Sequence, residues 1–253
     1  MRENPMKPLE GRVALVTGGN SGIGLGAARA FAREGASVAI TGRDEATLNA
    51  AAKEIGSGTL AIRADVTKLP DIDAVMGRVR ERFRKIDALF VNAGVGKFVP
   101  LEQVTEAFYD ELMNVNLKGV FFTVQKALPL MGRGSAIVLN ASLNAHKGMP
   151  GTTVYGASKA AVANLAMTMS ADLLSRGIRV NSISPGPVES ALLKRAGLSG
   201  DQLKETNEWI KNQVPLKRFA TPDEIAEAVL YLCSEKSGFV VGTDLLIDGG
   251  MAL

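Results

Sequence analysis

A short apolar strand that runs directly into a glycine-rich turn constrains this chain more than any other stretch. Val13–Val16 is a continuous apolar run, as expected of a strand buried on both faces of a parallel sheet. Gly18, Gly22 and Gly24 follow, and an amphipathic helix comes next. In this order, the glycines let backbone N–H groups approach a pyrophosphate at the positive end of the helix. We therefore predict a dinucleotide site, the alternative being a tight turn without a ligand.

Strand-like and helix-like segments alternate along the rest of the chain. Further strands are expected at 36–41, 60–64, 87–91, 136–140, 179–183 and 244–248. This alternation predicts an α/β fold with a doubly wound, mostly parallel sheet of about seven strands and helices on both faces. A single long helix is expected over 105–131. We expect one dinucleotide-binding domain over 1–253, with a loose tail at 1–11 and a mobile substrate lid at 187–214.

Composition limits the partners and the cellular location. The formal net charge of the 253 residues is only +3, which is too small to indicate nucleic acid or a membrane surface as a partner. The single Cys233 excludes an intrachain disulfide, and with a single histidine, His146, it cannot form a Cys/His metal cluster. We expect no metal site, a buried Cys233 and a solvated His146, the alternative being that His146 contacts the substrate. Without a membrane-length apolar run or a signal-peptide core, the expected location is the cytoplasm.

Candidate proton-transfer chemistry lies in the stretch that contains Tyr155 and Lys159. These residues are four apart, so a helix places them on one face, one turn from each other. A nearby ammonium favours the phenolate and lowers the tyrosine pKa from its usual value of about 10. Ser142, just past the strand expected at 136–140, would hydrogen-bond a substrate oxygen. The three side chains suit proton transfer to or from a carbonyl or alcohol oxygen.

The end of the second expected strand indicates which dinucleotide binds. In a dinucleotide-binding fold this strand end faces the adenosine ribose, where an acid selects NAD and an arginine accommodates a 2′-phosphate. No acid stands at Thr41 or Gly42, and Arg43 follows them. A guanidinium is a planar bidentate partner for phosphate. We therefore favour NADP(H), with NAD(H) as the alternative if Arg43 stacks on adenine or stays solvated.

Five motifs in this order resemble the short-chain dehydrogenase/reductase family over residues ~11–250. They are the Gly-x-x-x-Gly-x-Gly turn, Asp65, Asn92-Ala93-Gly94, Asn116 with Ser142, Tyr155 and Lys159, and Pro185-Gly186. The chain is similar to 3-oxoacyl-[acyl-carrier-protein] reductase-like and glucose dehydrogenase-like members, which have a single-domain Rossmann fold of about 250 residues.

This resemblance implies a role for each matching residue. The catalytic residues would be Asn116, Ser142, Tyr155 and Lys159. The cofactor contacts would be Gly18, Asn20, Ser21, Gly22, Ile23, Gly24, Arg43, Asp65, Val66, Asn92, Ala93, Gly94, Tyr155, Lys159, Pro185, Gly186, Val188 and Ser190. In the family Asn116 marks a helix kink that holds a water joining Lys159 to solvent. From the residues alone, Asn116 could instead satisfy local backbone, and Asp65 could belong to the N-terminal cap region of the next helix.

Two positions depart from the family pattern. Ser190 stands where threonine is usual. Asn20 and Ser21 stand where many NADP-using relatives carry a basic residue. The first departure leaves a hydroxyl in place, whereas the second weakens the preference for NADP(H).

Three functions remain open at this point. The first is an NADP(H)-dependent oxidoreductase that transfers hydride reversibly between nicotinamide and a ketone or secondary alcohol, with Tyr155 as general acid and base. The second is a 3-oxoacyl-[acyl-carrier-protein] reductase, which needs a basic docking patch near the active-site mouth. Candidates for that patch are Lys126, Arg133, Arg176 and Arg179. The third is a catalytically silent dinucleotide-binding regulator.

The sequence says less about the assembly and the substrate. The helix after Tyr155 is rich in alanine, and the resemblance implies that such helices pack in a homotetramer, or a homodimer. The expected substrate pocket comprises 94–98, 143–149 and the 187–213 lid. It is mainly small, apolar or uncharged, with Lys97 and His146 as exceptions. The sequence identifies no particular carbonyl or alcohol substrate.

Overall fold

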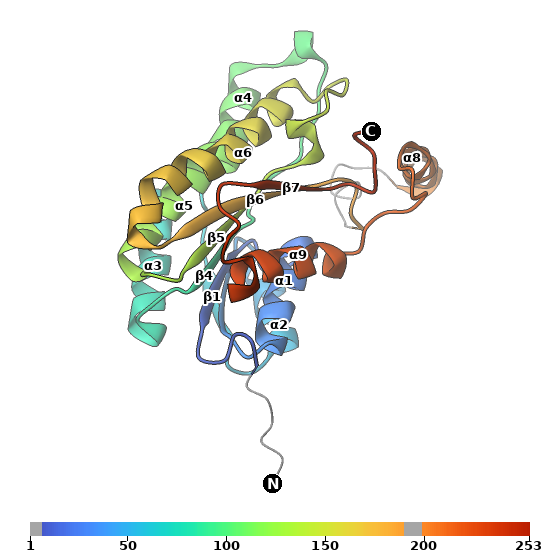
Figure 1. The fold of residues 1–253 in the computed structure, drawn as a ribbon. Helices are drawn as coiled ribbons and strands as arrows, with labels where there is room; N and C mark the ends of the chain where they lie inside the picture. The colour runs from blue at the N-terminus through green and yellow to red at the C-terminus, as the bar shows by residue number, and fades with distance from the viewer. Residues whose placement is uncertain (1–6, 190–198) are drawn as a thin grey trace.

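Seven parallel strands form one sheet in the computed structural model, which describes residues 7–189 and 199–253 (Figure 1). The strand order is β3-β2-β1-β4-β5-β6-β7, and each pairing is parallel. The strands are β1 (Val13–Thr17), β2 (Ser37–Gly42), β3 (Leu60–Arg63), β4 (Ala88–Val91), β5 (Ala136–Asn140), β6 (Arg179–Pro185) and β7 (Asp244–Ile247). The order reverses between β1 and β4, and ligands of such sheets bind outside the carboxyl ends of the strands at this point. The predicted doubly wound fold is confirmed, and its sheet is wholly parallel.

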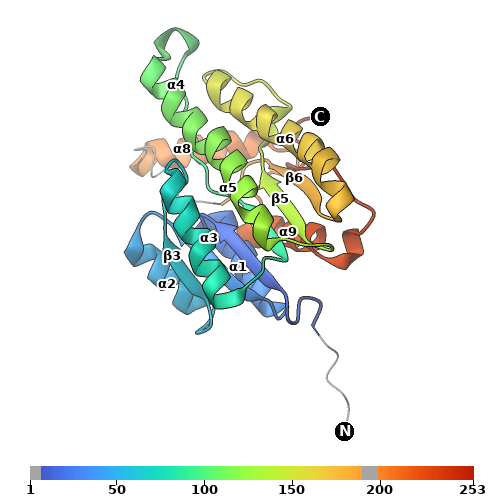
Figure 2. The same cartoon turned by 90° about the vertical axis from the view of Figure 1, so that its left-hand side faces the viewer.

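Helices cover both faces of the sheet (Figures 1 and 2). One face packs against α1 (Gly22–Arg33), α2 (Glu45–Ile55) and α9 (Pro222–Cys233), and the other against α3 (Leu69–Phe83), α5 (Gly119–Ala127) and α6 (Thr153–Leu173). Successive strand residues point to opposite faces. Leu15 accordingly joins the apolar cluster under α3, α5 and α6, whereas Ala14 and Val16 join the cluster under α1, α2 and α9.

The long helix expected over 105–131 is interrupted. The observed elements are α4 (Glu106–Met113), a π-helical turn (Asn114–Lys118), α5, and a 3-10 turn (Leu128–Leu130). A π-turn arises where one residue is inserted into the α-helical ladder, often at a functional site. Asn116 lies in this turn, so the α-helical hydrogen-bonding pattern is interrupted at the residue where a kink was predicted.

Further helical elements complete the chain. They are α8 (Gly200–Gln213) and short 3-10 turns at Leu101–Gln103, Leu143–Ala145, Leu174–Arg176 and Glu235–Ser237. The predicted lid at 187–214 lies partly outside the described residues, and α8 is the helix in its described part. Among the described residues, no helix combines the length and the apolar character that crossing a membrane requires.

The expected loose tail at 1–11 is wrong for the described residues 7–11. Leu9 is 3% exposed in the cluster under α1, and its N–H donates to Glu34 O. A single apolar side chain within a polar run therefore anchors this segment.

Candidate active site

Ser142, Tyr155, Lys159 and Asn116 meet at the carboxyl edge of the sheet. Ser142 lies two residues past the end of β5, and Tyr155 and Lys159 lie in the first two turns of α6. Asn116 reaches the same place from the π-turn, since its amide donates to the Ser158 hydroxyl at 3.3 Å. The structure thus brings together the four predicted catalytic residues from three separate elements.

Lys159 is held almost out of contact with water. It is 4% exposed, and its Nζ donates to the carbonyl oxygen of Asn140 at 2.6 Å. Burial disfavours the charged form and lowers the Lys159 pKa from 10.5 to about 8. The Nζ lies 5.9 Å from the centroid of the Tyr155 ring. The predicted closeness of Lys159 and Tyr155 on one helical face is confirmed.

The predicted lowering of the Tyr155 pKa is absent from this structure. Burial raises the pKa of the phenol, and a hydrogen bond with the Ser142 side chain opposes this effect only in part. The Lys159 ammonium donates its hydrogen bond to the Asn140 carbonyl. Phe98 adds to the apolar surroundings, because its ring meets the Tyr155 ring edge-on at 5.4 Å.

Asn116 is fully buried and braces a loop. Its Oδ1 accepts from Val95 N–H at 2.8 Å, and its Nδ2 donates to Val95 O at 2.9 Å. Asn116 therefore satisfies backbone groups, but they lie 21 residues away, so the alternative of a local backbone partner is wrong. Gly94 completes the arrangement, because a Cβ there would lie 3.3 Å from Asn116 Oδ1 and 3.4 Å from Lys159 Nζ.

The glycine turn has the geometry of a phosphate cradle. Gly18 and Gly22 adopt φ of 64° and 53°, a region that L side chains rarely enter. A Cβ at Gly24 would lie 2.6 Å from Asn92 Nδ2, so this position needs glycine for the helix to approach the sheet. The first turn of α1, Gly22–Leu25, is uncharged, which leaves its positive dipole end open to an anion. These residues fit a bound dinucleotide.

Asn92 connects three strands beneath this cradle. Its Nδ2 donates to Thr17 O at 3.0 Å and to Gly18 O at 3.2 Å, and its Oδ1 accepts from Asn140 Nδ2 at 2.9 Å. The Thr17 hydroxyl accepts from the N–H groups of Asn92 and Ala93. Asn92 and Ala93 therefore brace the sheet at this edge. The buried Asn140 Oδ1 has no hydrogen-bond partner within the described residues, which leaves an acceptor beside Lys159.

The end of β2 presents an exposed arginine. Arg43 lies on the surface, and its carbonyl accepts from Arg63 Nε at 3.1 Å. Asn20 Nδ2 donates to Thr47 Oγ1, and the Asn20 side chain lies where a Cβ at Gly42 would meet it at 2.8 Å. The close approach of Asn20 therefore requires glycine at position 42. Because Gly42 has no side chain, the first side chain beyond this strand is that of Arg43.

Asp65 and Val66 end the neighbouring strand region. Burial would raise the Asp65 pKa, but hydrogen bonds from Thr67 and the charges of Arg43 and Lys68 lower it overall. Asp65 Oδ1 accepts from the N–H and hydroxyl of Thr67, which caps the turn before α3. The cap interpretation of Asp65 is therefore correct in part, because it caps a turn, whereas α3 begins later.

The segment after β6 lies against the last strand. The N–H of Gly186 donates to Ile247 O, and a Cβ at Gly186 would lie 2.7 Å from Asp248 Cα. Val188 forms a parallel bridge with Ala220. The predicted contact at Ser190 lies outside the described residues.

The two charged exceptions in the expected pocket are both paired with acids. Lys97 Nζ contacts both carboxylate oxygens of Glu111, at 2.7 and 2.6 Å. His146 is exposed, as expected, but its Nε2 also lies 2.5 Å from Asp244 Oδ2, a partner that was not expected. A carboxylate 98 residues away binds it, which no local pattern around His146 could indicate.

The predicted basic docking patch lies at the wrong end of the sheet. Arg179 begins β6 and pairs with Ala136 at the beginning of β5, whereas Ser142 follows the end of β5. The side chains of Arg176 and Arg179 donate to backbone carbonyls, and Lys126 pairs with Asp73. These residues precede the strands whose carboxyl ends carry the site, so they do not surround its mouth.

Several supporting residues escaped the sequence analysis. Asn140 accepts from Lys159 and donates to Asn92, yet in the sequence it is only the last residue of a strand. Asp244 accepts from the buried hydroxyls of Ser182 and Ser184 as well as binding His146. Because Asp244 begins an apolar strand, the sequence indicated that its carboxylate needs hydrogen-bond donors. Which residues donate to it depends on the fold.

Comparison with known proteins agrees with this geometry. A family model described as enoyl-(acyl carrier protein) reductase matches residues 18–252. Galactitol 2-dehydrogenase of Agrobacterium fabrum is 37% identical over 253 residues, covering 96% of this chain and 98% of that protein. The 3-oxoacyl-[acyl-carrier-protein] reductase of Thermotoga maritima is 35% identical over 252 residues, covering 97% and 99%.

Solved structures give the same result. A short-chain dehydrogenase/reductase of Serratia marcescens is similar with a TM-score of 0.90 and 33% identity, covering 97% of this chain and 100% of that one. Taken together, fold and relatives define a nicotinamide-dependent oxidoreductase that acts between CH–OH and C=O groups. The chain belongs to the short-chain dehydrogenase/reductase family.

Proposed function

We propose that this protein is an NADP(H)-dependent oxidoreductase that interconverts a ketone and a secondary alcohol with Tyr155 as the general acid and base. The observation that supports this most directly is the convergence of Ser142, Tyr155 and buried Lys159 at the carboxyl edge of the sheet. The nicotinamide supplies or accepts the hydride when it is bound. In reduction the Tyr155 hydroxyl donates its proton to the carbonyl oxygen, and in oxidation it takes the proton from the alcohol.

The neighbouring residues prepare Tyr155 for this step. Ser142 hydrogen-bonds the Tyr155 side chain and would orient the substrate oxygen beside it. Lys159 would hold the cofactor ribose, and a charged ammonium redirected toward the phenol would lower the Tyr155 pKa into a useful range. Asn116 holds the Val95 loop above Lys159 and would support proton exchange with solvent.

The preference for NADP(H) over NAD(H) rests on Arg43. Its exposed guanidinium follows Gly42 at the end of β2, where the adenosine ribose of a dinucleotide would lie. The glycine turn, the residues Asp65 and Val66, and the Pro185–Val188 segment would contact the rest of the cofactor. We also propose that the enzyme is cytoplasmic.

The test follows nicotinamide absorbance with NADPH and NADH over a panel of ketones and β-ketoacyl thioesters. We expect turnover with NADPH, and a loss of at least about 100-fold in kcat for Tyr155→Phe, since general acid catalysis is worth about 10²–10⁴-fold. Arg43→Ala should raise the KM for NADPH about tenfold or more and change the KM for NADH little.

Matched control variants separate these kinetic effects from a general loss of folded or active protein. Tyr231→Phe removes a hydroxyl from a tyrosine on α9 that is 42% exposed, and should retain full activity. Arg133→Ala removes an exposed arginine at the opposite edge of the sheet and should leave both KM values unchanged. NADPH binding without turnover of any substrate would favour the silent regulator, and activity that survives Tyr155→Phe would refute the proposed proton donor.

The proposed enzyme is a homotetramer, or a homodimer, assembled through its helices. Ala157 and Ala160 lie exposed on α6, where small side chains permit close approach of another helix. An apolar groove beside them is lined by Met113, Leu117, Phe121, Phe122 and Leu165, together with Asn114 and Lys118. Exposed apolar surface of this kind marks interaction sites.

A further inference from the structure

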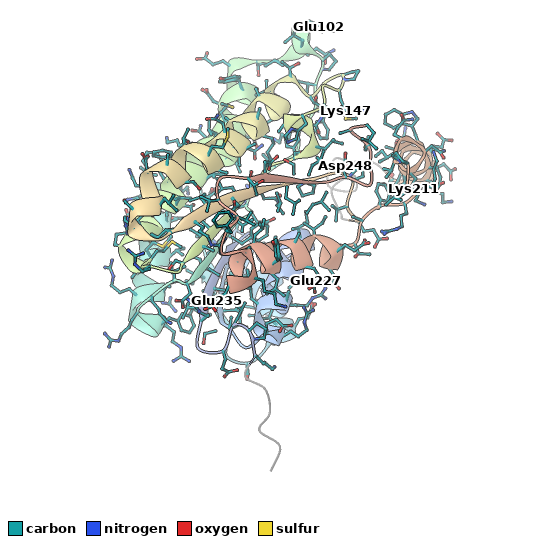
Figure 3. The ribbon with its side chains drawn as sticks, viewed as in Figure 1. Glu102, Lys147, Lys211, Glu227, Glu235 and Asp248 are labelled. Carbon is teal, nitrogen blue, oxygen red and sulfur yellow. The ribbon has the colours of Figure 1, made fainter. Side chains whose placement is uncertain are left out.

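The last residues of the chain form a turn that is fixed against the active-site loop. Asp248 accepts from the N–H groups of Gly250 and Ala252, at 2.9 and 2.7 Å. Lys147, in the loop between Ser142 and Tyr155, donates from Nζ to the carbonyl oxygen of Met251. Figure 3 shows Lys147 and Asp248 at the same end of the molecule, far from Glu235. The C-terminal turn is therefore held at the carboxyl edge of the sheet.

This turn places the Met251 side chain in an apolar cluster beside the catalytic residues. Met251, Leu143 and Val214 are 5%, 3% and 2% exposed, and Met149 packs against them. Leu143 directly follows Ser142, and Val214 directly follows α8. A Cβ at Gly249 would lie 2.8 Å from Val214 Cγ1, which shows how closely the turn packs against the end of α8.

Among the described residues, three basic side chains of the expected pocket are bound by protein groups. Lys97 is paired with Glu111, His146 with Asp244, and Lys147 with the Met251 carbonyl. A polyhydroxylated or anionic substrate would have to break one of these pairs to bind any of the three. Phe98, which is 47% exposed and meets the Tyr155 ring, extends the apolar surface on the other side of the phenol.

We propose that Met251 of the C-terminal turn, with Leu143, Met149 and Val214, forms an apolar wall that selects secondary alcohols and ketones carrying an apolar substituent. This inference rests on the proposed function, since it assumes that Tyr155 faces the reacting oxygen. Apolar pockets discriminate by about 10–200-fold for each methylene that they bury, and they offer little to a hydroxyl group. The predicted substrate class is therefore an aliphatic or aromatic alcohol or ketone, and polyols and carboxylates are disfavoured.

The experiment compares acyclic alcohols as substrates of the full-length enzyme with NADP⁺. Butan-2-ol and hexan-2-ol differ by two methylenes, galactitol has the six-carbon chain with a hydroxyl on every carbon, and 3-hydroxyhexanoate adds a carboxylate. We expect kcat/KM for hexan-2-ol to exceed that for butan-2-ol, galactitol and 3-hydroxyhexanoate by about tenfold or more. Met251→Gln, which keeps the side-chain length, should remove most of the hexan-2-ol advantage and change butan-2-ol less than threefold.

Two controls accompany this comparison. Met167→Gln makes the same chemical change at a methionine of α6 that is 54% exposed, and should leave the ratio of hexan-2-ol to butan-2-ol unchanged. Met251→Leu keeps the wall apolar and should retain the ratio. If Met251→Gln fails to fold, a lowered ratio in Met149→Gln serves as the second test.

The outcomes distinguish the wall from the activity itself. Turnover that prefers galactitol or 3-hydroxyhexanoate, or a Met251→Gln ratio equal to that of the parent, would overturn the apolar wall and leave the proposed oxidoreductase intact. Absence of turnover with every alcohol, or turnover that persists in Tyr155→Phe, would overturn the proposed function and the wall with it.

Discussion

Lys159 is buried and the adjacent Tyr155 is half-buried, and desolvation moves their pKa values in opposite directions. The Lys159 pKa is lowered to about 8, and the Tyr155 pKa is raised, because a low-dielectric site disfavours the charged form of either group. Each shift pushes its residue toward the neutral form. A charged group brought close to the pair, such as a bound phosphate, would therefore change the protonation of both residues.

The lowered Lys159 pKa predicts a distinct dependence of stability on pH. Below pH 8 both folded and unfolded chains hold this proton, whereas between pH 8 and 10.5 the unfolded chain keeps a proton that the folded chain has lost. The contribution of Lys159 to the unfolding free energy therefore rises with pH, by about 2 kcal/mol from pH 7.5 to 9.5. Urea unfolding of the parent and of Lys159→Met should show this rise in the difference between them.

Other groups cancel in that difference. Burial raises the Cys233 pKa to about 12, so this thiol lowers stability as pH rises above 9, but it does so in both proteins. Tyr155 titrates above the tested range, because its pKa is raised above 10. A parent-minus-variant difference that stays flat from pH 7.5 to 9.5 would show that the Lys159 pKa is not lowered.

At the scale of single residues, the sequence predicted those neighbours in the structure that are also close together in the chain. Tyr155 and Lys159 are one helical turn apart, so their shared face followed from helix geometry. The acceptor of Lys159 and the partner of His146 did not follow, because Asn140 and Asp244 become neighbours of these residues only when β5, β6 and β7 lie side by side. The direction of the Tyr155 pKa shift was missed for the same reason, since burial depends on the whole core.

At the scale of elements, the loop between β5 and α6 is attached to β7 through one carboxylate. Asp244 accepts from Ser182 at 2.5 Å and from Ser184 at 2.7 Å, and it binds His146 of the loop at 2.5 Å. Both serines are fully buried, so no water can replace the carboxylate as their acceptor. Asp244 thus couples the edge strand to the loop that precedes Tyr155.

Asp244→Ala should therefore destabilise the fold well beyond a surface change. It leaves two buried hydroxyls without their acceptor, and each costs about 1–3 kcal/mol. Urea unfolding should show a clear loss of stability, with a smaller loss for Asp244→Asn, which keeps one acceptor oxygen. Asp201→Ala, at an exposed acid of α8, should change stability by less than about 0.5 kcal/mol. An Asp244→Ala value equal to that of Asp201→Ala would contradict the coupling.

The apolar pattern of the sequence predicts where strands begin and end, but it does not predict an irregularity inside a helix. The seven strands lie within two residues of their predicted positions, because each is a short apolar run closed by a turn. The π-turn at Asn114–Lys118 could not be predicted from the apolar pattern alone, since one inserted residue leaves that pattern almost unchanged. Asn116 in this turn pairs with the Val95 backbone, a contact between distant segments that the sequence pattern does not reveal.

At the scale of the whole molecule, the described residues include two exposed apolar surfaces against which another chain could pack. One is the groove between the π-turn, α5 and α6, where Phe121 is 40% exposed. The other is the free edge of β7, where Leu245 and Leu246 are 38% and 37% exposed. Edge strands and apolar patches invite association with another chain. Each surface therefore supports the proposed assembly of identical subunits.

The groove gives the sharper prediction, because one substitution can disable it. In light scattering after size exclusion, we expect the parent to have the mass of four chains of 26.6 kDa, or of two. Phe121→Glu places a carboxylate where the apolar surface would be buried, and burying an unpaired charge is costly enough to lower the mass. Leu174→Glu, at a leucine that is 52% exposed and outside the groove, should leave the mass unchanged. A monomeric parent, or a Phe121→Glu variant with the parental mass, would show that this groove does not join subunits.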